Sequence, residues 1–147
     1  MSSTVKRAGG LDEALALQQE ALELKRKVLG PEHLNTLNSM MLVRQLLKLQ
    51  GRLDEAETLA RETLARCERS LGPKHSLTTA SQLHLAGYLQ DRAPAAALDL
   101  LESAVRNGLE PSLRREVSVE LFPALRGNGR FEALVAEVQK AQPARSP

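Results

Sequence analysis

Apolar residues recur along the chain at spacings of three and four positions, which is the period of an amphipathic helix. The pattern is clearest over residues 53–71, where one stripe consists of Leu53, Ala56, Ala60, Thr63, Leu64, Cys67 and Leu71. Gly72 and Pro73 follow this stripe. They predict the end of the helix, because Gly accepts the left-handed closing conformation and Pro cannot continue the hydrogen-bond ladder.

The same pattern along the whole chain predicts an all-α fold of about seven helices. Their expected ranges are 11–29, 35–50, 53–71, 77–91, 94–108, 112–126 and 130–141. Connections of two to five residues make neighbouring helices antiparallel hairpins. Asn35 or Thr36 is expected to cap the second helix, and Ser76 or Thr78 the fourth.

Pro123 lies inside the sixth expected helix. It predicts a kink or break near residues 119–123, because proline removes one backbone donor and clashes with the carbonyl four residues earlier. We expect one helical domain over residues 11–141, a flexible N-terminal segment over residues 1–10 and a flexible tail over residues 142–147.

An internal repeat of 42 residues organises the first two thirds of the chain. Residues 11–50 match residues 53–92 at 14 positions. The identities include Leu-Asp-Glu-Ala at 11–14 and 53–56, Leu-Gly-Pro at 29–31 and 71–73, and His33 with His75. Chance would give about one match in ten positions, so the segment is duplicated. A worn third copy begins near Ala97, and a fourth start lies at residues 129–133.

Composition supports helices and excludes a sheet. The chain has 28 Leu and 19 Ala, two Phe, one Tyr and no Trp. Strands favour β-branched and aromatic side chains, whereas Leu and Ala are strong helix formers. The few aromatic residues also argue against a platform on which nucleic-acid bases stack.

Charge and cysteine content narrow the functional classes further. A net charge of +2 provides no strong field for nucleic acid or an anionic membrane. The single Cys67 excludes an internal disulfide. No signal peptide and no apolar run of about 20 residues is visible in the sequence. We therefore expect a cytoplasmic protein.

The duplicated unit resembles the tetratricopeptide repeat, in the 42-residue variety found in kinesin light chains. The motifs that carry the resemblance are Leu-Gly-Pro-Glu-His at 29–33, Leu-Gly-Pro-Lys-His at 71–75 and Gly-Arg-Leu-Asp-Glu-Ala at 51–56. It covers residues 9–92 well and residues 93–141 loosely. The resemblance implies a right-handed superhelical solenoid of antiparallel helix pairs, whose concave face is lined by the first helix of each pair.

The opening helix, 11–29, matches the second helix of a pair and has no first helix before it. Three alternatives remain for covering this helix: residues 1–10, a partner chain, or further repeats of a longer protein. Other departures from the family pattern concern the small residue where paired helices touch. It is Ala86 in the second copy, but Arg44 in the first and Phe122 in the third. Only Gln45 is polar among the positions that match the family's peptide-binding polar residues, so a carboxylate clamp is not indicated.

Candidate chemical groups have simpler structural explanations. His33 and His75 recur one repeat apart and therefore favour a role in the turn over a metal site. Cys67 lies on an apolar stripe, without a base at a suitable spacing. The acidic pairs at 12–13 and 54–55 are expected in first turns, where the helix dipole favours negative charge. Gly9-Gly10 and Gly127-Asn128-Gly129 are expected at turns and do not form a phosphate loop.

Charged clusters also favour a structural interpretation. The basic residues at 25–27 are balanced by Glu20, Glu23 and Glu32, which is typical of a solvated face. The chain is therefore predicted not to be an enzyme and to need no cofactor or metal.

Two functions remain. In the first, a non-enzymatic scaffold binds a peptide or a partner helix in the concave groove. The expected groove residues are Asn38, Met41, Gln45, Lys48, Leu83, His84, Gly87 and Gln90. In the second, the chain is a structural or oligomerising repeat segment that self-associates through helix 11–29. We favour the first function.

Overall fold

The computed structural model describes residues 3–141, and its described part is helical without strands. Two compact units divide the chain, one ending at Ser70 and the other beginning at Leu71. The predicted all-α fold of seven helices in sequential antiparallel pairs is confirmed for the described residues. The expected flexible tail, 142–147, lies outside them, as do residues 1–2.

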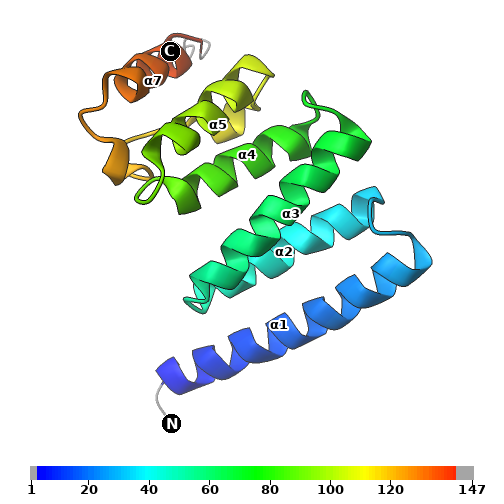
Figure 1. The fold of residues 1–147 in the computed structure, drawn as a ribbon. Coiled ribbons are helices and arrows are strands. Elements are labelled where there is room, and N and C mark those ends of the chain that lie inside the picture. Colours follow the sequence, from blue (N-terminus) through cyan, green and yellow to red (C-terminus); the bar gives the residue numbers. More distant parts are fainter. Residues whose placement is uncertain (1–2, 142–147) are drawn as a thin grey trace, which may run out of the picture. The chain divides into compact units, whose positions relative to one another are not determined.

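The first unit is built from three helices: α1 (Ser3–Val28), α2 (Leu34–Leu49) and α3 (Leu53–Leu71). α1 packs against α2, and successive helices run antiparallel (Figure 1). α2 and α3 have the predicted bounds to within one residue.

α1 begins at Ser3, eight residues before the predicted start at residue 11. The expected turn at Gly9-Gly10 is therefore wrong, because both glycines lie inside the helix. Glycine lowers helix stability without preventing a helix, so a glycine pair alone does not indicate a turn.

The acidic pairs at residues 12–13 and 54–55 have different surroundings. Asp54 and Glu55 lie in the first turn of α3, as predicted. Asp12 and Glu13 lie well inside α1, so the helix-dipole explanation is wrong for them. Asp12 instead accepts a hydrogen bond from the Nε2 atom of Gln50, the residue that ends α2. This bond joins the two helices.

The repeated Leu-Gly-Pro-x-His motif forms the turn that starts the next helix. The Nδ1 atom of His33 accepts a hydrogen bond from the Asn35 amide at 3.1 Å, and His75 accepts one from the Leu77 amide at the same distance. Both histidines are therefore N-caps, so the predicted turn role is confirmed. The caps predicted at residues 35–36 and at 76 or 78 are wrong, because those residues lie inside α2 and α4.

A second bond closes each turn. Thr36 donates its hydroxyl to the Gly30 carbonyl at 2.8 Å, and Thr78 donates to the Gly72 carbonyl at 2.7 Å. Gly30 and Gly72 have φ values of 100° and 85°, which only glycine adopts readily. The two threonines match each other in the repeat because both bind a carbonyl of a helix end.

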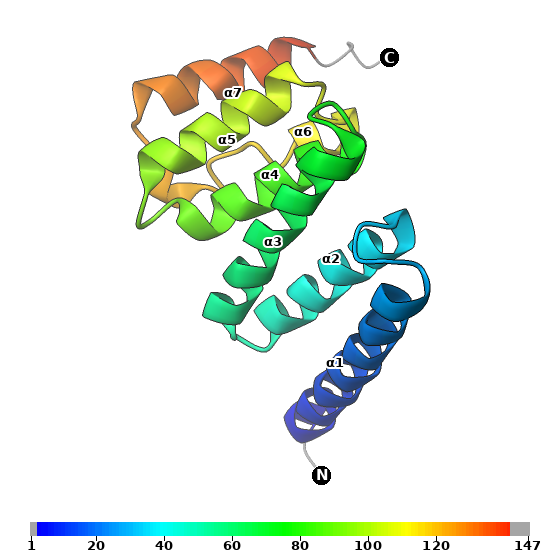
Figure 2. The same cartoon turned by 45° about the vertical axis from the view of Figure 1, so that its right-hand side comes forward.

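The second unit contains α4 (Ser76–Leu89), α5 (Pro94–Arg106), the short α6 (Pro111–Arg114), a 3-10 turn (Pro123–Leu125) and α7 (Gly129–Ala141). α5 packs against both α4 and α7, and Figure 2 shows α5 and α7 lying side by side. The rings of Phe122 and Phe131 pack with centroids 6.1 Å apart. The loop before α7 is thereby fixed to its first turn.

The predicted helix 112–126 is wrong in length, because α6 ends at Arg114. The break begins earlier than residues 119–123. Two physical reasons combine. Val117, Ser118 and Val119 are poor helix formers, and Phe122 precedes a proline, which moves it out of the helical region to φ −125° and ψ 57°.

Small and aliphatic side chains fill the core, as the composition predicts. The buried core of the first unit includes Leu37, Met40, Ala56, Ala60 and Cys67. That of the second includes Ala86, Ala97, Leu98, Leu101, Ala104 and Leu109. Alanine at the helix contacts allows the backbones to approach, and leucine fills the remaining space.

Candidate functional site

The exposed face of α2 carries the first four residues of the predicted groove. Asn38, Gln45 and Lys48 are exposed, and Met41 is half-buried. Their spacing of three, four and three residues places them on one side of the helix. Three leucines of the same helix are also exposed, namely Leu34, Leu42 and Leu49 at 43%, 49% and 59%. The face therefore combines apolar surface with hydrogen-bonding groups and one cation.

The four predicted groove residues of α4 have a different environment. Leu83 and Gln90 are buried, and His84 and Gly87 are half-buried. The Nε2 atom of Gln90 donates to the Leu121 carbonyl at 2.9 Å, and its Oε1 atom accepts from the Ala124 amide at 3.2 Å. Gln90 is thus engaged in holding the irregular segment before α7, which the sequence did not reveal.

A groove of about 550 Å³ lies between the three helices of the first unit. Its lining residues are Gln19, Leu22, Glu23, Arg26, Val43, Leu47, Asp54, Glu55, Thr58, Leu59 and Glu62. Leu22, Val43 and Leu47 are buried, and the charged residues surround them. Sequence reasoning missed this groove, because its residues come from three helices and share no motif.

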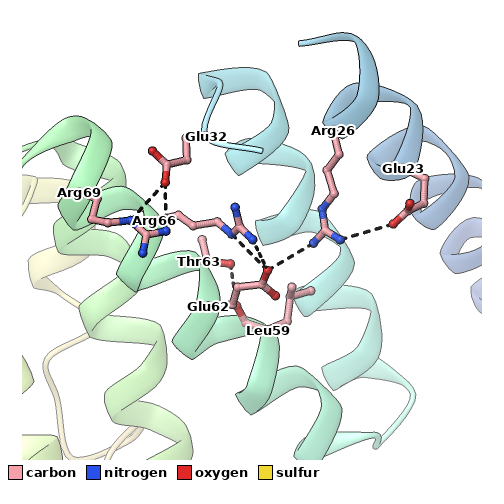
Figure 3. Close-up of polar contacts among 8 residues, drawn as sticks. All are labelled: Glu23, Arg26, Glu32, Leu59, Glu62, Thr63, Arg66 and Arg69. Atoms are coloured by element: carbon pink, nitrogen blue, oxygen red, sulfur yellow. Dashed lines mark hydrogen bonds and ion pairs between the residues drawn. The ribbon is translucent and has the colours of Figure 1, made fainter. Parts of the chain in front are cut away.

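Ion pairs occupy one side of this groove. Arg26 of α1 pairs with Glu23 at 3.4 Å and with Glu62 of α3 at 3.8 Å, and Glu62 also pairs with Arg66 at 2.8 Å (Figure 3). Nearby, Glu32 pairs with Arg69 at 3.0 Å. The groove's charges are therefore largely neutralised within the unit.

The basic cluster at residues 25–27 belongs to the same set of contacts. Lys25 donates to the Ser39 hydroxyl at 2.7 Å, and Arg26 pairs as described above. Lys25 and Arg26 are half-buried and join α1 to α2 and α3, so only the exposed Lys27 fits the solvated face that the sequence predicted.

Metal-ligating residues and the single cysteine were considered as candidate chemical groups in the sequence. Within residues 3–141, no three His, Cys, Asp or Glu side chains are placed to hold a metal ion. Cys67 is fully buried on the apolar side of α3, as predicted. The pKa of Arg130 is raised by hydrogen bonds from its guanidinium to Glu102 and Asp99, which join α7 to α5.

Among the described residues, none of the helices has both the length and the apolar stretch needed to cross a bilayer.

Known protein families and structures were compared with this chain. Two tetratricopeptide repeat models match it, over residues 1–35 and 45–108. None of the curated proteins compared with the chain matches it.

Solved structures give the same result. Tetratricopeptide-like repeats from Podospora anserina, assigned as a kinesin light chain, are 25% identical with a TM-score of 0.73, covering 96% of this chain and 73% of theirs. A single-residue variant of those repeats is 24% identical with a TM-score of 0.74 and the same coverage. BtubC (BKLC) from P. vanneervenii is 17% identical with a TM-score of 0.72, covering 95% and 63% of the two chains. The chain therefore belongs to the tetratricopeptide repeat family, and its repeats are of the kinesin-light-chain type.

Proposed function

We propose that this protein is a non-enzymatic, cytoplasmic interaction module that binds a peptide or helix of a partner protein on the exposed face of α2. Tetratricopeptide repeats generally mediate contacts between proteins. The proposal keeps the α2 half of the predicted groove, Asn38, Met41, Gln45 and Lys48. It leaves out the α4 half, because the amide of Gln90 is already bonded to the backbone of residues 121 and 124.

The observation that carries the proposal is the exposure of three leucines on α2 beside these polar residues. An isolated exposed leucine is ordinary, but adjacent exposed apolar side chains mark contact surfaces in soluble proteins. Leu34, Leu42 and Leu49 lie along the same side of α2 as Asn38 and Gln45. A partner would bury the leucines, while the amides and Lys48 set its register.

The groove between α1, α2 and α3 is a weaker candidate. A ligand there would have to displace the contacts of Arg26 with Glu23 and Glu62, and of Arg52 with Glu55. Breaking such pairs removes part of the gain from burying the groove's apolar residues.

The test is a double substitution, Gln45→Ala with Lys48→Glu. We expect it to abolish capture of partners from native lysate, because it removes a hydrogen-bonding amide and reverses the cation. The matched control is Gln139→Ala with Lys140→Glu, the same changes at exposed neighbouring positions of α7. Affinity capture with quantitative mass spectrometry compares the three proteins.

Both variants should melt at the temperature of the unmodified protein, because all four positions are exposed. Partners that are lost with the α2 variant and kept with the α7 control support the proposal. Equal capture by all three proteins contradicts it.

A second candidate function has one specific observation in its favour. α1 exposes Leu17, Leu24 and Val28 at 65%, 62% and 72%. An oligomerising segment would use this surface.

A further inference from the structure

α1 has two apolar sides, and only one of them is covered. Leu15 and Leu22 are buried at 3% and 5% exposure, on the side that packs on α2. Leu17, Leu24 and Val28 are exposed on another side, with the half-buried Ala21 between them. We call these four residues the α1 seam. Their spacings of four, three and four residues are those of a two-helix coiled-coil contact.

Half of the α1 seam, Leu24 and Val28, is a property of this helix and not of the repeat. The two copies of the repeat align directly at a distance of 42 positions. Leu24 corresponds to Arg66 in α3, and Val28 corresponds to Ser70. Leu17 and Ala21 correspond to the half-buried Leu59 and the buried Thr63, so α3 differs in kind from the seam only at Arg66 and Ser70. The repeat therefore does not account for the exposed apolar side chains of Leu24 and Val28.

Charges beside the seam are arranged in a self-complementary way. A shallow groove along α1 is lined by Leu17, Glu20, Ala21, Glu23, Leu24 and Lys27. Glu20 and Lys27 lie seven residues apart, so they share one edge of the seam. In an antiparallel pair of these helices, Lys27 of the second copy would lie opposite Glu20 of the first. Glu20 of the second copy would lie opposite Lys27 of the first. One helix thus carries both halves of two equivalent ion pairs.

We propose that the α1 seam binds the same surface of a second copy of this chain, with the two helices antiparallel. In this arrangement Leu17 packs against the partner's Val28, and Ala21 packs against the partner's Leu24. Glu20 pairs with the partner's Lys27. Two-fold symmetry repeats each contact, as in other closed homodimers.

The charges select this register and direction. Sliding the antiparallel pair by one heptad places Glu20 against the partner's Glu20, and like charges repel. A parallel pair would bring Glu20 toward the partner's Lys25. Lys25 is already bonded to Ser39 of α2, so it lies on the covered side of the helix. Antiparallel pairing uses only groups beside the exposed seam.

The inference rests on the second candidate function and is independent of partner binding by the α2 face. Because the seam spans only two heptads, the interface is small and the dimer is weak. Interfaces smaller than about 1,200 Å² are typical of weak, transient complexes. The dimer should therefore appear as concentration rises.

Sedimentation equilibrium of the full chain, over a hundredfold range of concentration, tests the proposal. We expect the mass to rise from 16.1 kDa toward twice that value. Leu24→Glu should keep the protein monomeric throughout, because it places a charge in the centre of the seam. Circular dichroism should show an unchanged helix content for this variant, since Leu24 is exposed.

Charge reversal tests the register. Glu20→Lys and Lys27→Glu should each weaken the dimer about tenfold, because each creates two repulsive pairs. The two reversals together should restore the affinity. Glu137→Lys on α7 is the matched control and should have no effect, since it is exposed and distant in sequence from the seam.

Three outcomes overturn the inference. The first is a monomer at every concentration, which would leave the seam to some other occupant. The second is a dimer that Leu24→Glu does not weaken. The third is a Lys27→Glu variant that dimerises normally, which excludes the antiparallel register. None of these results bears on capture by the α2 face, so the two proposals fail separately.

Discussion

A histidine in the repeated turn has a purely structural use at the scale of single residues. His33 and His75 each cap the helix that follows, through an Nδ1 atom that accepts from an amide two residues later. The first amides of a helix have no partner within it, so a side-chain acceptor there stabilises the helix. This role explains why histidine recurs at the 42-residue period without any metal.

Replacing His75 by alanine should lower the free energy of unfolding by about 1 kcal/mol, the usual cost of losing an N-cap. His75→Asn is the matched control, because asparagine is a strong N-cap and should retain most of the stability. Urea unfolding followed by circular dichroism measures both. Equal stability of the alanine and asparagine variants would show that the bond to Leu77 contributes nothing.

At the scale of elements, the irregular segment between α6 and α7 shows how a repeat can lose a helix and stay packed. The chain leaves the helical path after Arg114, yet Val117, Phe122 and Leu125 remain buried. Gln90 compensates for part of the lost helix by bonding to the backbone of Leu121 and Ala124. One side chain of α4 thus replaces backbone bonds that a regular helix would have made.

Gln90→Leu should destabilise this segment, because it leaves a carbonyl and an amide without partners at a cost of about 1–3 kcal/mol. Hydrogen exchange should become faster in peptides that cover residues 115–128 and stay unchanged in α1. Gln139→Leu is the matched control, since Gln139 is exposed on α7. Unchanged exchange over residues 115–128 would contradict the role given to Gln90.

At the scale of the whole molecule, buried leucine and alanine contribute more to stability than the visible ion pairs. The side chains of Arg26 and Glu62 are 29% and 38% exposed, and those of Glu32 and Arg69 are 39% and 64% exposed. Pairs in contact with water are worth about 0–1 kcal/mol. Leu37 and Leu101, by contrast, are completely buried.

Leu37→Ala and Leu101→Ala should each lower the free energy of unfolding by about 2–5 kcal/mol, since each removes buried methyl groups and leaves a cavity. Raising the salt concentration to about 1 M, which shortens the screening length to about 3 Å, should change the stability by less than about 1 kcal/mol. Urea titrations at low protein concentration measure both effects without a contribution from the dimer. If the added salt lowered the free energy of unfolding as much as Leu37→Ala does, the ion pairs would contribute as much as the buried leucines, contrary to this prediction.

The sequence by itself determined the helical class, the repeat and most helix bounds. These depend on local signals: an apolar period of 3.6, a glycine with a positive φ at a helix end, and a proline that cannot continue a helix. α3 was predicted at its observed bounds for this reason. Local signals failed where two of them competed, as at Gly9-Gly10 within α1 and at Val117–Val119 after α6.

Only the tertiary structure decided which polar groups are already engaged and which apolar faces are left uncovered. The side-chain amide of Gln90 bonds to Leu121, which lies 31 positions away in the sequence. The carboxylate of Asp12 bonds to Gln50, which lies 38 positions away. Likewise, Leu22 and Leu24 of α1 have the same hydrophobicity, yet one is buried and the other exposed. Periodicity indicates that a helix has an apolar side, but burial depends on which neighbour packs there, and that neighbour is distant in sequence.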